Sequence, residues 1–208
     1  MTLNRWIVIA AAGALAVGAY AFAGKFGKVT VGAAAPAFAT MDSNGKSLSL
    51  ADLKGKYVVL EWCNFGCPYV QKHYNSGNMQ ALQKKYTDKG IVWLTIFSSA
   101  PGYQGYYKPD KLNELAKEKD MHSRLIPDPD GTIGRMYDAR NTPTMFVINP
   151  QGDVVYMGGI DDQPTPDPES LKGAHNYVSM ALDQALAGQP VQVTHSRPYG
   201  CSIKYKDN

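Results

Sequence analysis

The chain has 208 residues, of which 44% are hydrophobic and 19% are charged, and its formal net charge is +3. This length and composition are typical of one globular domain with an appendage. Because the net charge is small and the Lys and Arg residues are scattered along the chain, the sequence argues against nucleic acid as a partner.

The first 24 residues are typical of a secretory signal peptide or an N-terminal membrane anchor. Arg5 precedes an apolar run from Trp6 to about Gly24, and two small-x-small cleavage patterns lie near the end of that run. The run is also long enough to cross a bilayer. A cleaved signal, an uncleaved anchor and a buried core helix all stay open. In the first two cases we expect a periplasmic or secreted protein, or one tethered to the outer face of the inner membrane.

Residues 25–37 are rich in Gly, Ala and Pro and predict a linker, which precedes a predicted domain over residues 38–187. Strand and helix patterns alternate along this domain and indicate a layered α/β sheet. The expected strands lie at 56–62, 91–99 and 124–128, with a pair at 142–160 that is joined by a turn at 149–152. The expected helices lie at 68–90 (interrupted at 75–77), 108–120, 131–140 and 169–187. Residues 188–208 predict a polar C-terminal tail, which carries Cys201.

Two of the three cysteines, Cys63 and Cys67, lie four positions apart between a predicted strand and a predicted helix. Pro68 favours the first position of a helix. Cys67 is therefore expected at the helix cap, where unpaired backbone N–H groups and the helix dipole favour negative charge. Because the thiolate is the nucleophile in sulfur chemistry, this placement suits a reactive cysteine. The alternative is a small buried hydrophobic residue.

The other two cysteines are candidate partners of Cys67. Cys63 is near enough in sequence to reach Cys67 across a short loop, and so short a loop favours an exchangeable disulfide over a structural one. Cys201 is interpreted either as a further redox partner that moves in from the tail or as an anchor that ties the tail down.

The dipeptide Thr142-Pro143 opens the strand pair at 142–160, and proline is tolerated only at the end of such a strand. With a cis bond, this loop can lie beside a cysteine and present backbone groups to an extended substrate. With a trans bond, the proline merely starts the strand. The sequence leaves both readings open because cis X-Pro bonds are a minority state.

The segment APAFATMDSNGKSLSLADLKGKYVVLEW resembles the opening of redoxin domains, the group that contains the alkyl hydroperoxide reductase/thiol-specific antioxidant and TlpA-like proteins. Trp62-Cys63 is similar to the Trp-Cys that begins the thioredoxin active site, and Thr142-Pro143 stands where thioredoxins carry their cis-proline. CPYVQKHY and RPYGCSIKY also resemble a peroxiredoxin-like subgroup. The resemblance covers residues 35–187 and implies a thioredoxin fold, with a central mixed β-sheet flanked by helices.

The resemblance also implies thiol–disulfide oxidoreductase chemistry on a partner protein or small thiol, with no cofactor. Thioredoxin separates its cysteines by two residues, whereas three intervene here. Cys63 can therefore attack first with Cys67 resolving, or Cys67 can attack with Cys63 or Cys201 resolving. The helix-cap argument favours Cys67 as the nucleophile.

Four residues are expected to support the cysteines. Trp62 and the loop at Thr142 and Pro143 are expected to shape the groove that docks a partner. Glu61 precedes Trp62 on the strand, and it is either a proton shuttle for the cysteine pair or a strand-end carboxylate in solvent.

A peroxiredoxin-like thiol peroxidase is the first alternative function. That family places a hydroxyl three residues before its cysteine and an arginine before the late strand, where this chain has Asn64 and Thr142. Arg135 and Arg140 are near in sequence but are interpreted as surface or helix-end cations. An efficient peroxidase is therefore doubtful.

The spacing Cys-x-x-x-Cys-Pro also resembles Sco-like copper chaperones, which is the second alternative. Those proteins carry a histidine before the late strand, and this chain has none there, so no metal ligands are assigned. His73 follows Cys67 by six residues, so on a continuous helix it points away from the cysteine. The other three histidines are interpreted as surface or capping residues: His122, His175 and His195. Four acidic residues are interpreted as turn residues rather than calcium ligands: Asp128, Asp130, Asp161 and Asp162.

Overall fold

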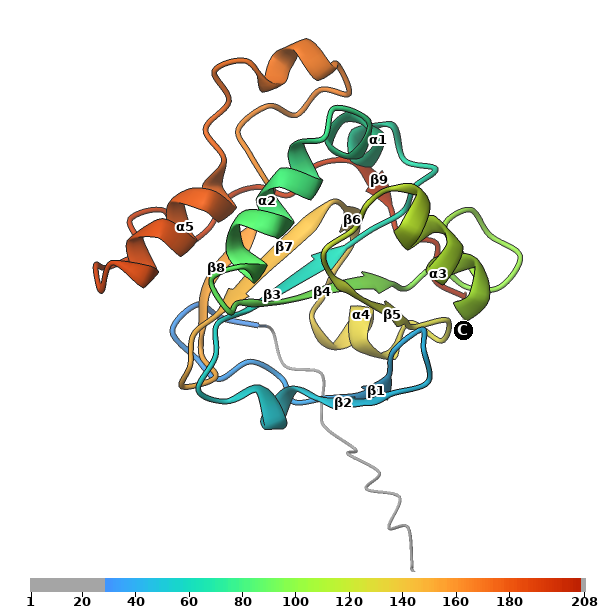
Figure 1. Cartoon of the computed structure of the whole chain (residues 1–208), viewed down its shortest axis with the longest axis horizontal. Helices are drawn as coiled ribbons and strands as arrows, with labels where there is room; N and C mark the ends of the chain where they lie inside the picture. Colours follow the sequence, from blue (N-terminus) through green and yellow to red (C-terminus); the bar gives the residue numbers. More distant parts are fainter. Residues whose placement is uncertain (1–28, 207–208) are drawn as a thin grey trace, which may run out of the picture.

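A five-stranded mixed β-sheet forms the centre of the computed structural model, which describes residues 29–206 (Figure 1). The strand order is β5-β4-β3-β7-β8. β3 pairs in parallel with β4 and β4 with β5, whereas β7 runs antiparallel to both β3 and β8. The bounds are β3 Val58–Trp62, β4 Val92–Phe97, β5 Arg124–Pro127, β7 Thr144–Ile148 and β8 Val154–Gly158. The predicted mixed α/β sheet is confirmed.

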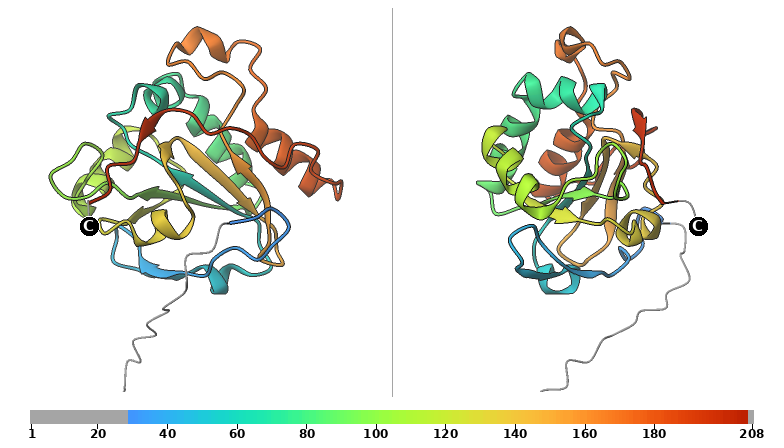
Figure 2. Two further views of the ribbon diagram at one scale, coloured as in Figure 1. Left: turned by 180° about the vertical axis from the view of Figure 1, so that it is seen from behind. Right: turned by 90° about the vertical axis from the view of Figure 1, so that its right-hand side faces the viewer.

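Helices cover both faces of this sheet (Figure 2). One face carries α1 Pro68–Asn75, α2 Asn78–Thr87, α3 Pro109–Glu118 and α5 Tyr177–Leu186. The other face carries α4 Thr132–Met136, the hairpin of β1 Ala39–Met41 and β2 Ser47–Ser49, and the 3-10 turn η1 Leu50–Leu53. The predicted break between α1 and α2 is confirmed, and Gly77 occupies it with φ 75°, a conformation that glycine adopts without strain.

Alternation along β3 decides which side chains belong to which layer, because successive residues of a strand point to opposite faces. Val58, Leu60 and Trp62 pack with the α4 layer, whereas Val59 packs with the layer of α1, α2, α3 and α5. Glu61 shares the face of Val59 and is therefore directed toward the four helices. All five residues of β3 are buried, as expected for a strand covered on both faces.

The last helix begins later than predicted. The sequence pattern indicated residues 169–187, but α5 starts at Tyr177, and residues Pro168–Leu171 form only a separate 3-10 turn, η2. Gly173 has φ 84°, outside the helical region. The side chain of Asn176 accepts a hydrogen bond from the Ser179 N–H, which caps the new start.

Both ends of the described chain are packed on the domain. Within the predicted linker, Gly32 and Ala35 donate backbone hydrogen bonds to Val154 and Gly152. In the tail, β9 Cys201–Ser202 pairs antiparallel with β6 Asn141–Thr142, two short strands that lie beside α1 in Figure 1. The predicted signal or anchor at residues 1–24 lies outside the described residues. Between residues 29 and 206, no helix combines the length and apolarity needed to cross a bilayer.

Candidate active site

Cys67 caps helix α1, as the sequence predicted. It is the N-cap residue with an extended backbone (φ −85°, ψ 122°), Pro68 follows at the first helical position, and the cysteine side chain is fully buried. Its Sγ lies 3.2 Å from the carbonyl oxygen of Thr142, to which the thiol donates a hydrogen bond. The Thr142–Pro143 bond is cis, so the cis reading of this dipeptide is confirmed and its loop lies against Cys67.

Cys201 of the tail reaches the same sulfur. The backbone N–H of Cys201 donates to Sγ of Cys67 over 3.4 Å, and the register of β6 and β9 sets Cys201 opposite Thr142. Burial and a hydrogen bond with Cys67 raise the pKa of the Cys201 thiol to about 11. All three cysteines are free thiols. The tail therefore places a second sulfur beside the one at the helix cap.

Cys63 lies at the end of β3 in the same apolar layer as Cys67. Its backbone N–H donates to Ile96, and its side chain is buried. Burial, together with the charge of Glu61, raises the pKa of the Cys63 thiol well above its usual value. Cys63 is therefore held in the neutral thiol form, which is a poor nucleophile.

Glu61 is buried completely, so the interpretation of it as a strand-end carboxylate in solvent is wrong. Its two oxygens accept four hydrogen bonds, at distances between 2.8 and 3.1 Å, from Tyr74 Oη, Trp93 Nε1, Gln83 Nε2 and Thr95 Oγ1. Burial raises the pKa of Glu61, although these donors oppose that shift.

Tyr74 connects Glu61 with Cys63. Its hydroxyl donates to Glu61, and its interaction with Cys63 counteracts part of the rise in the pKa of that thiol. The alternative interpretation, in which Glu61 exchanges a proton with the cysteine site, stays a prediction.

Trp62 lies in the interior on the other side of the sheet. Its indole N–H donates to Ser98 Oγ at 3.1 Å, and its ring packs against Tyr137 and Phe146 with centroids 5.4 Å apart in each pair. The side chain is fully buried in the α4 layer, whereas Cys67 belongs to the opposite layer. The expectation that Trp62 shapes a docking groove is wrong, because strand alternation turns it away from the cysteines.

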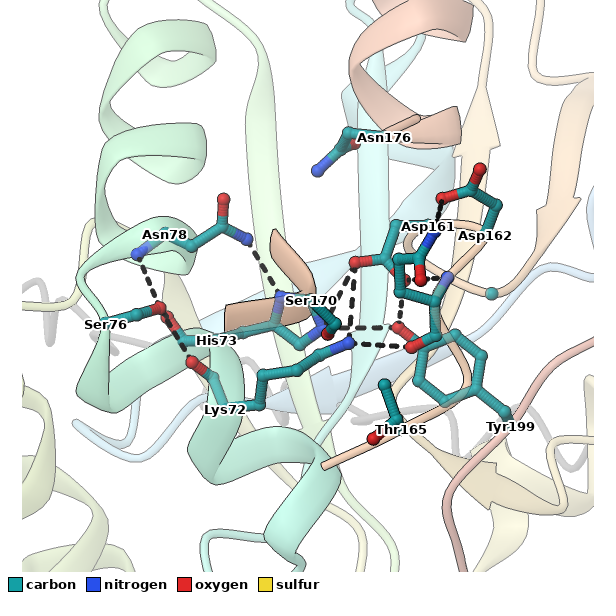
Figure 3. A network of polar contacts seen from close by, with 12 residues as sticks. Lys72, His73, Ser76, Asn78, Asp161, Asp162, Thr165, Ser170, Asn176 and Tyr199 are labelled. Atoms are coloured by element: carbon teal, nitrogen blue, oxygen red, sulfur yellow. Dashed lines mark hydrogen bonds and ion pairs between the residues drawn. The ribbon is translucent and has the colours of Figure 1, made fainter. Parts of the chain in front are cut away.

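Sequence reasoning missed a buried polar cluster that joins α1 to the tail (Figure 3). The cluster, here called the latch, consists of Lys72 and His73 of α1, Asp161 after β8, and Tyr199 of the tail. Lys72 Nζ lies 3.7 Å from Asp161 Oδ2, and both side chains are almost completely buried. The Tyr199 hydroxyl donates to Asp161 Oδ1 and contacts His73 Nε2 at 3.3 Å. The interpretation of Asp161 as a turn residue is therefore incomplete, because its carboxylate holds the tail.

His73 is neutral within the latch. Asn78 Nδ2 lies 2.8 Å from Nδ1 of His73 and donates to it, so the ring proton is on Nε2 and faces Tyr199. Burial, and the charge of Lys72 beside it, lower the pKa of His73 to about 3. Both effects disfavour the imidazolium.

Substituting His73 by glutamine is expected to change how stability depends on pH. In the unfolded chain His73 titrates near its ordinary pKa of 6.5, and in the folded chain near 3, so the unfolded state binds more protons between these values. Its contribution to stability is full above pH 6.5 and is lost as the pH falls. Between pH 7 and pH 5 the wild-type protein should therefore lose roughly 2 kcal/mol more than His73→Gln. Urea unfolding at both pH values measures the difference, and equal losses in the two proteins would contradict the buried neutral imidazole.

The two candidate arginines make contacts with residues other than the cysteines, and the described residues contain no cluster of metal ligands. The side chain of Arg140 is 77% exposed and pairs with Asp138, and Arg135 lies over the Tyr205 ring, so both are surface cations as predicted. Among residues 29–206, no three His, Cys, Asp or Glu side chains gather as a metal site would require.

Comparisons with known proteins found a matching family and several relatives. The model of the AhpC/TSA family matches residues 31–157. The curated thiol-disulfide oxidoreductase ResA of Bacillus subtilis (strain 168) is 30% identical over 141 residues, which cover 64% of this chain and 69% of that protein. ResA of Bacillus cereus (strain ATCC 10987 / NRS 248) is 28% identical over 143 residues, covering 67% of this chain and 78% of that protein.

Solved structures share the fold. A hypothetical protein from Sinorhizobium meliloti 1021 superposes with a TM-score of 0.76 at 21% identity, covering 88% of this chain and 98% of that one. A putative thiol:disulfide interchange protein DsbE from Chlorobium tepidum gives 0.52 at 24% identity, covering 62% and 85%. The thioredoxin fold implied by the sequence resemblance is confirmed.

Proposed function

Because the chain belongs to the AhpC/TSA family and is a thiol–disulfide oxidoreductase, we propose that it exchanges disulfides with an exported partner through Cys67 and Cys201. The observation that carries the proposal is the contact of Cys67 Sγ with the backbone of both Cys201 and Thr142. These contacts put a buried sulfur at a helix cap, beside a second sulfur and the backbone of the cis-proline loop.

The exchange proceeds in two balanced steps. The thiolate of Cys67 attacks one sulfur of the partner's disulfide, a Cys67–partner disulfide forms, and the partner's second sulfur leaves and takes up a proton. The thiolate of Cys201 then attacks Cys67 and releases the partner's first sulfur as a thiol. The partner disulfide is reduced by two electrons, and Cys67 and Cys201 are oxidised to a disulfide. The reverse sequence oxidises a partner dithiol.

Cys201 suits the resolving role better than Cys63 does. Cys201 is only half-buried, and its strand contacts Cys67 directly. Cys63 is buried in an apolar layer, with its thiol kept neutral by burial and by Glu61. A resolving cysteine must reach the mixed disulfide, and both the contact with Cys67 and the partial exposure of Cys201 favour the tail.

The signal-like sequence of residues 1–24 supports export, and so does this chemistry, because disulfides persist outside the cytosol. We propose that the domain works in the periplasm, secreted or tethered to the membrane. Recovery of the native protein in the cytosolic fraction of its own cells would rule out this location.

Removing Cys201 is expected to trap the mixed disulfide. In Cys201→Ser the first step proceeds but the second loses its attacking sulfur. After incubation with glutathione disulfide, intact-protein mass spectrometry should show one glutathione on most molecules, bound to Cys67, whereas the wild-type protein should keep little of this adduct. Cys63→Ala, which retains Cys201, serves as the matched control and should behave as the wild type. The proposed pair of Cys67 and Cys201 would be overturned if wild type and Cys201→Ser carried the same amount of glutathione adduct. It would also be overturned if Cys63→Ala, and not Cys201→Ser, accumulated the adduct.

A further inference from the structure

The last residues of the chain bind the domain as an added β-strand. Tyr199, Cys201, Ile203 and Tyr205 alternate along an extended segment and are each at least partly buried. Beyond the β6–β9 pair, the Ile203 N–H donates to the carbonyl of Arg140, and the Ala100 N–H donates to the carbonyl of Lys204. The surface under residues 199–205 is here called the tail seat. It binds the tail mainly through main-chain hydrogen bonds, which is how many domains bind extended peptides.

The residue before the seated cysteine has no room for a side chain. A Cβ added to Gly200 would lie 2.0 Å from the Thr142 carbonyl oxygen, and Gly200 has φ 113°, which other residues rarely adopt. Asn141 Nδ2 donates to the Gly200 carbonyl at 3.1 Å and fixes this close approach. The tail seat therefore selects glycine at this position.

At the position before this glycine, the latch selects an aromatic side chain with a hydroxyl group. Tyr199 donates to Asp161, its ring lies 5.3 Å from Lys72 Nζ, and α1 carries Lys72 little more than one turn after Cys67. Two cavities, of about 620 Å³ and about 350 Å³, are both lined in part by Arg197 and Pro198, just before the seated segment.

The tail is attached without a covalent bond to the seat, because all three cysteines are free thiols. Attachment to the same chain gives such a segment an effective concentration on the order of millimolar. A partner's segment must therefore displace the tail before it reaches Cys67.

We propose that the tail seat is the docking surface for the partner's disulfide-bearing segment, and that the tail occupies it as a built-in competitor. The partner segment is an extended polypeptide with the pattern Tyr-Gly-Cys. The tail seat holds the cysteine of this segment beside Cys67, in the place that Cys201 now occupies. This inference rests on the proposed function, since the partner's cysteine reacts at Cys67. When the tail returns, Cys201 resolves the mixed disulfide and the tail displaces the partner segment from the tail seat.

A peptide of residues 197–205 with Cys201→Ser tests the inference without any thiol chemistry. Its affinity for the full-length Tyr199→Ala protein, measured by fluorescence anisotropy, should exceed that for wild type at least tenfold, because the loosened tail competes less. Tyr199→Phe, which keeps the ring, should give a smaller gain and covers the case in which Tyr199→Ala fails to fold. The half-exposed Tyr103 gives the matched control, Tyr103→Ala, which should bind as wild type does. A second peptide that also carries Gly200→Ala should bind at least tenfold more weakly.

Equal affinity of wild type and both Tyr199 variants, or equal affinity of the two peptides, would overturn the inference. Dimerisation of Tyr199→Ala with no gain in peptide binding would also overturn it, because the seat would then take the tail of a second copy. The glutathione trapping described above reports on the proposed function separately. If peptide docking fails while glutathione trapping succeeds, only the inference about the tail seat is rejected. If trapping fails, the proposed exchange through Cys67 and Cys201 is rejected.

Discussion

Replacing Cys67 by serine is expected to lower the rate of thiol–disulfide exchange by about a thousandfold or more, because both steps of the exchange pass through its sulfur. The hydroxyl of serine forms no disulfide, and the neighbouring thiols do not occupy the helix cap. Reduction of insulin disulfides in the presence of dithiothreitol, followed by turbidity and corrected for the rate without protein, measures the loss.

The matched control for this prediction is Cys63→Ala, which removes the other cysteine of the same motif. We expect it to retain exchange within about tenfold of wild type, because a buried thiol that stays neutral takes no part in the attack. Cys67→Ser with near-normal activity, or Cys63→Ala as inactive as Cys67→Ser, would reverse the assignment of the nucleophile.

Replacing Glu61 by alanine is expected to lower the free energy of unfolding by about 4 kcal/mol. Four donors meet this buried carboxylate, and alanine removes that acceptor from all of them while opening a cavity between β3 and the helices. Gln83 and Thr95 each keep a second partner, whereas the buried Trp93 N–H loses its acceptor. Urea unfolding followed by tryptophan fluorescence measures the change, since the donor Trp93 lies within the affected network.

Two variants make the Glu61 prediction specific. Glu61→Gln keeps the volume and one acceptor, so it should lose about half as much stability as Glu61→Ala. Glu118→Ala removes a carboxylate whose side chain is 63% exposed and should change stability by less than about 0.5 kcal/mol. A loss below about 1 kcal/mol in Glu61→Ala would show that the carboxylate does not organise the core.

The sequence predicted the sheet well because its central strands are continuous apolar runs. Residues 58–62 and 92–97 have no helical period and are bounded by turn residues, so their strand character is local. The place of Cys67 was equally local, since Pro68 marks the first helical position. The late start of α5 was missed because Leu171 and Ala174 continue its apolar spacing toward the N-terminus, whereas Gly173 and the cap Asn176 interrupt the helix.

The environments of Glu61 and Asp161 depend on contacts between distant parts of the chain. Glu61 meets donors from α1, α2 and β4, and Asp161 meets α1 and the tail. Local sequence patterns do not predict hydrogen-bond partners that are distant along the chain. The orientation of Trp62 was within reach, because alternation along a strand separates it from the face of Glu61.

The tail was predicted to be polar, without any strand, yet its sequence contains a strand pattern. Tyr199, Cys201, Ile203 and Tyr205 repeat with a period of two, which is the pattern of a strand with one buried face. A period of two over so few residues is short, and the glycine and lysine between them masked it. What the pattern lacked was the location of the partner strand, which only the fold supplies.

Mapping the disulfide of the oxidised wild-type protein tests most directly the claim that Cys67 and Cys201 form the exchanging pair. The full chain is oxidised with glutathione disulfide, alkylated, digested without reductant and analysed by tandem mass spectrometry. The account predicts a peptide pair that links Cys67 to Cys201, with Cys63 alkylated. A link between Cys63 and Cys67 with Cys201 alkylated, or three alkylated cysteines, would contradict it.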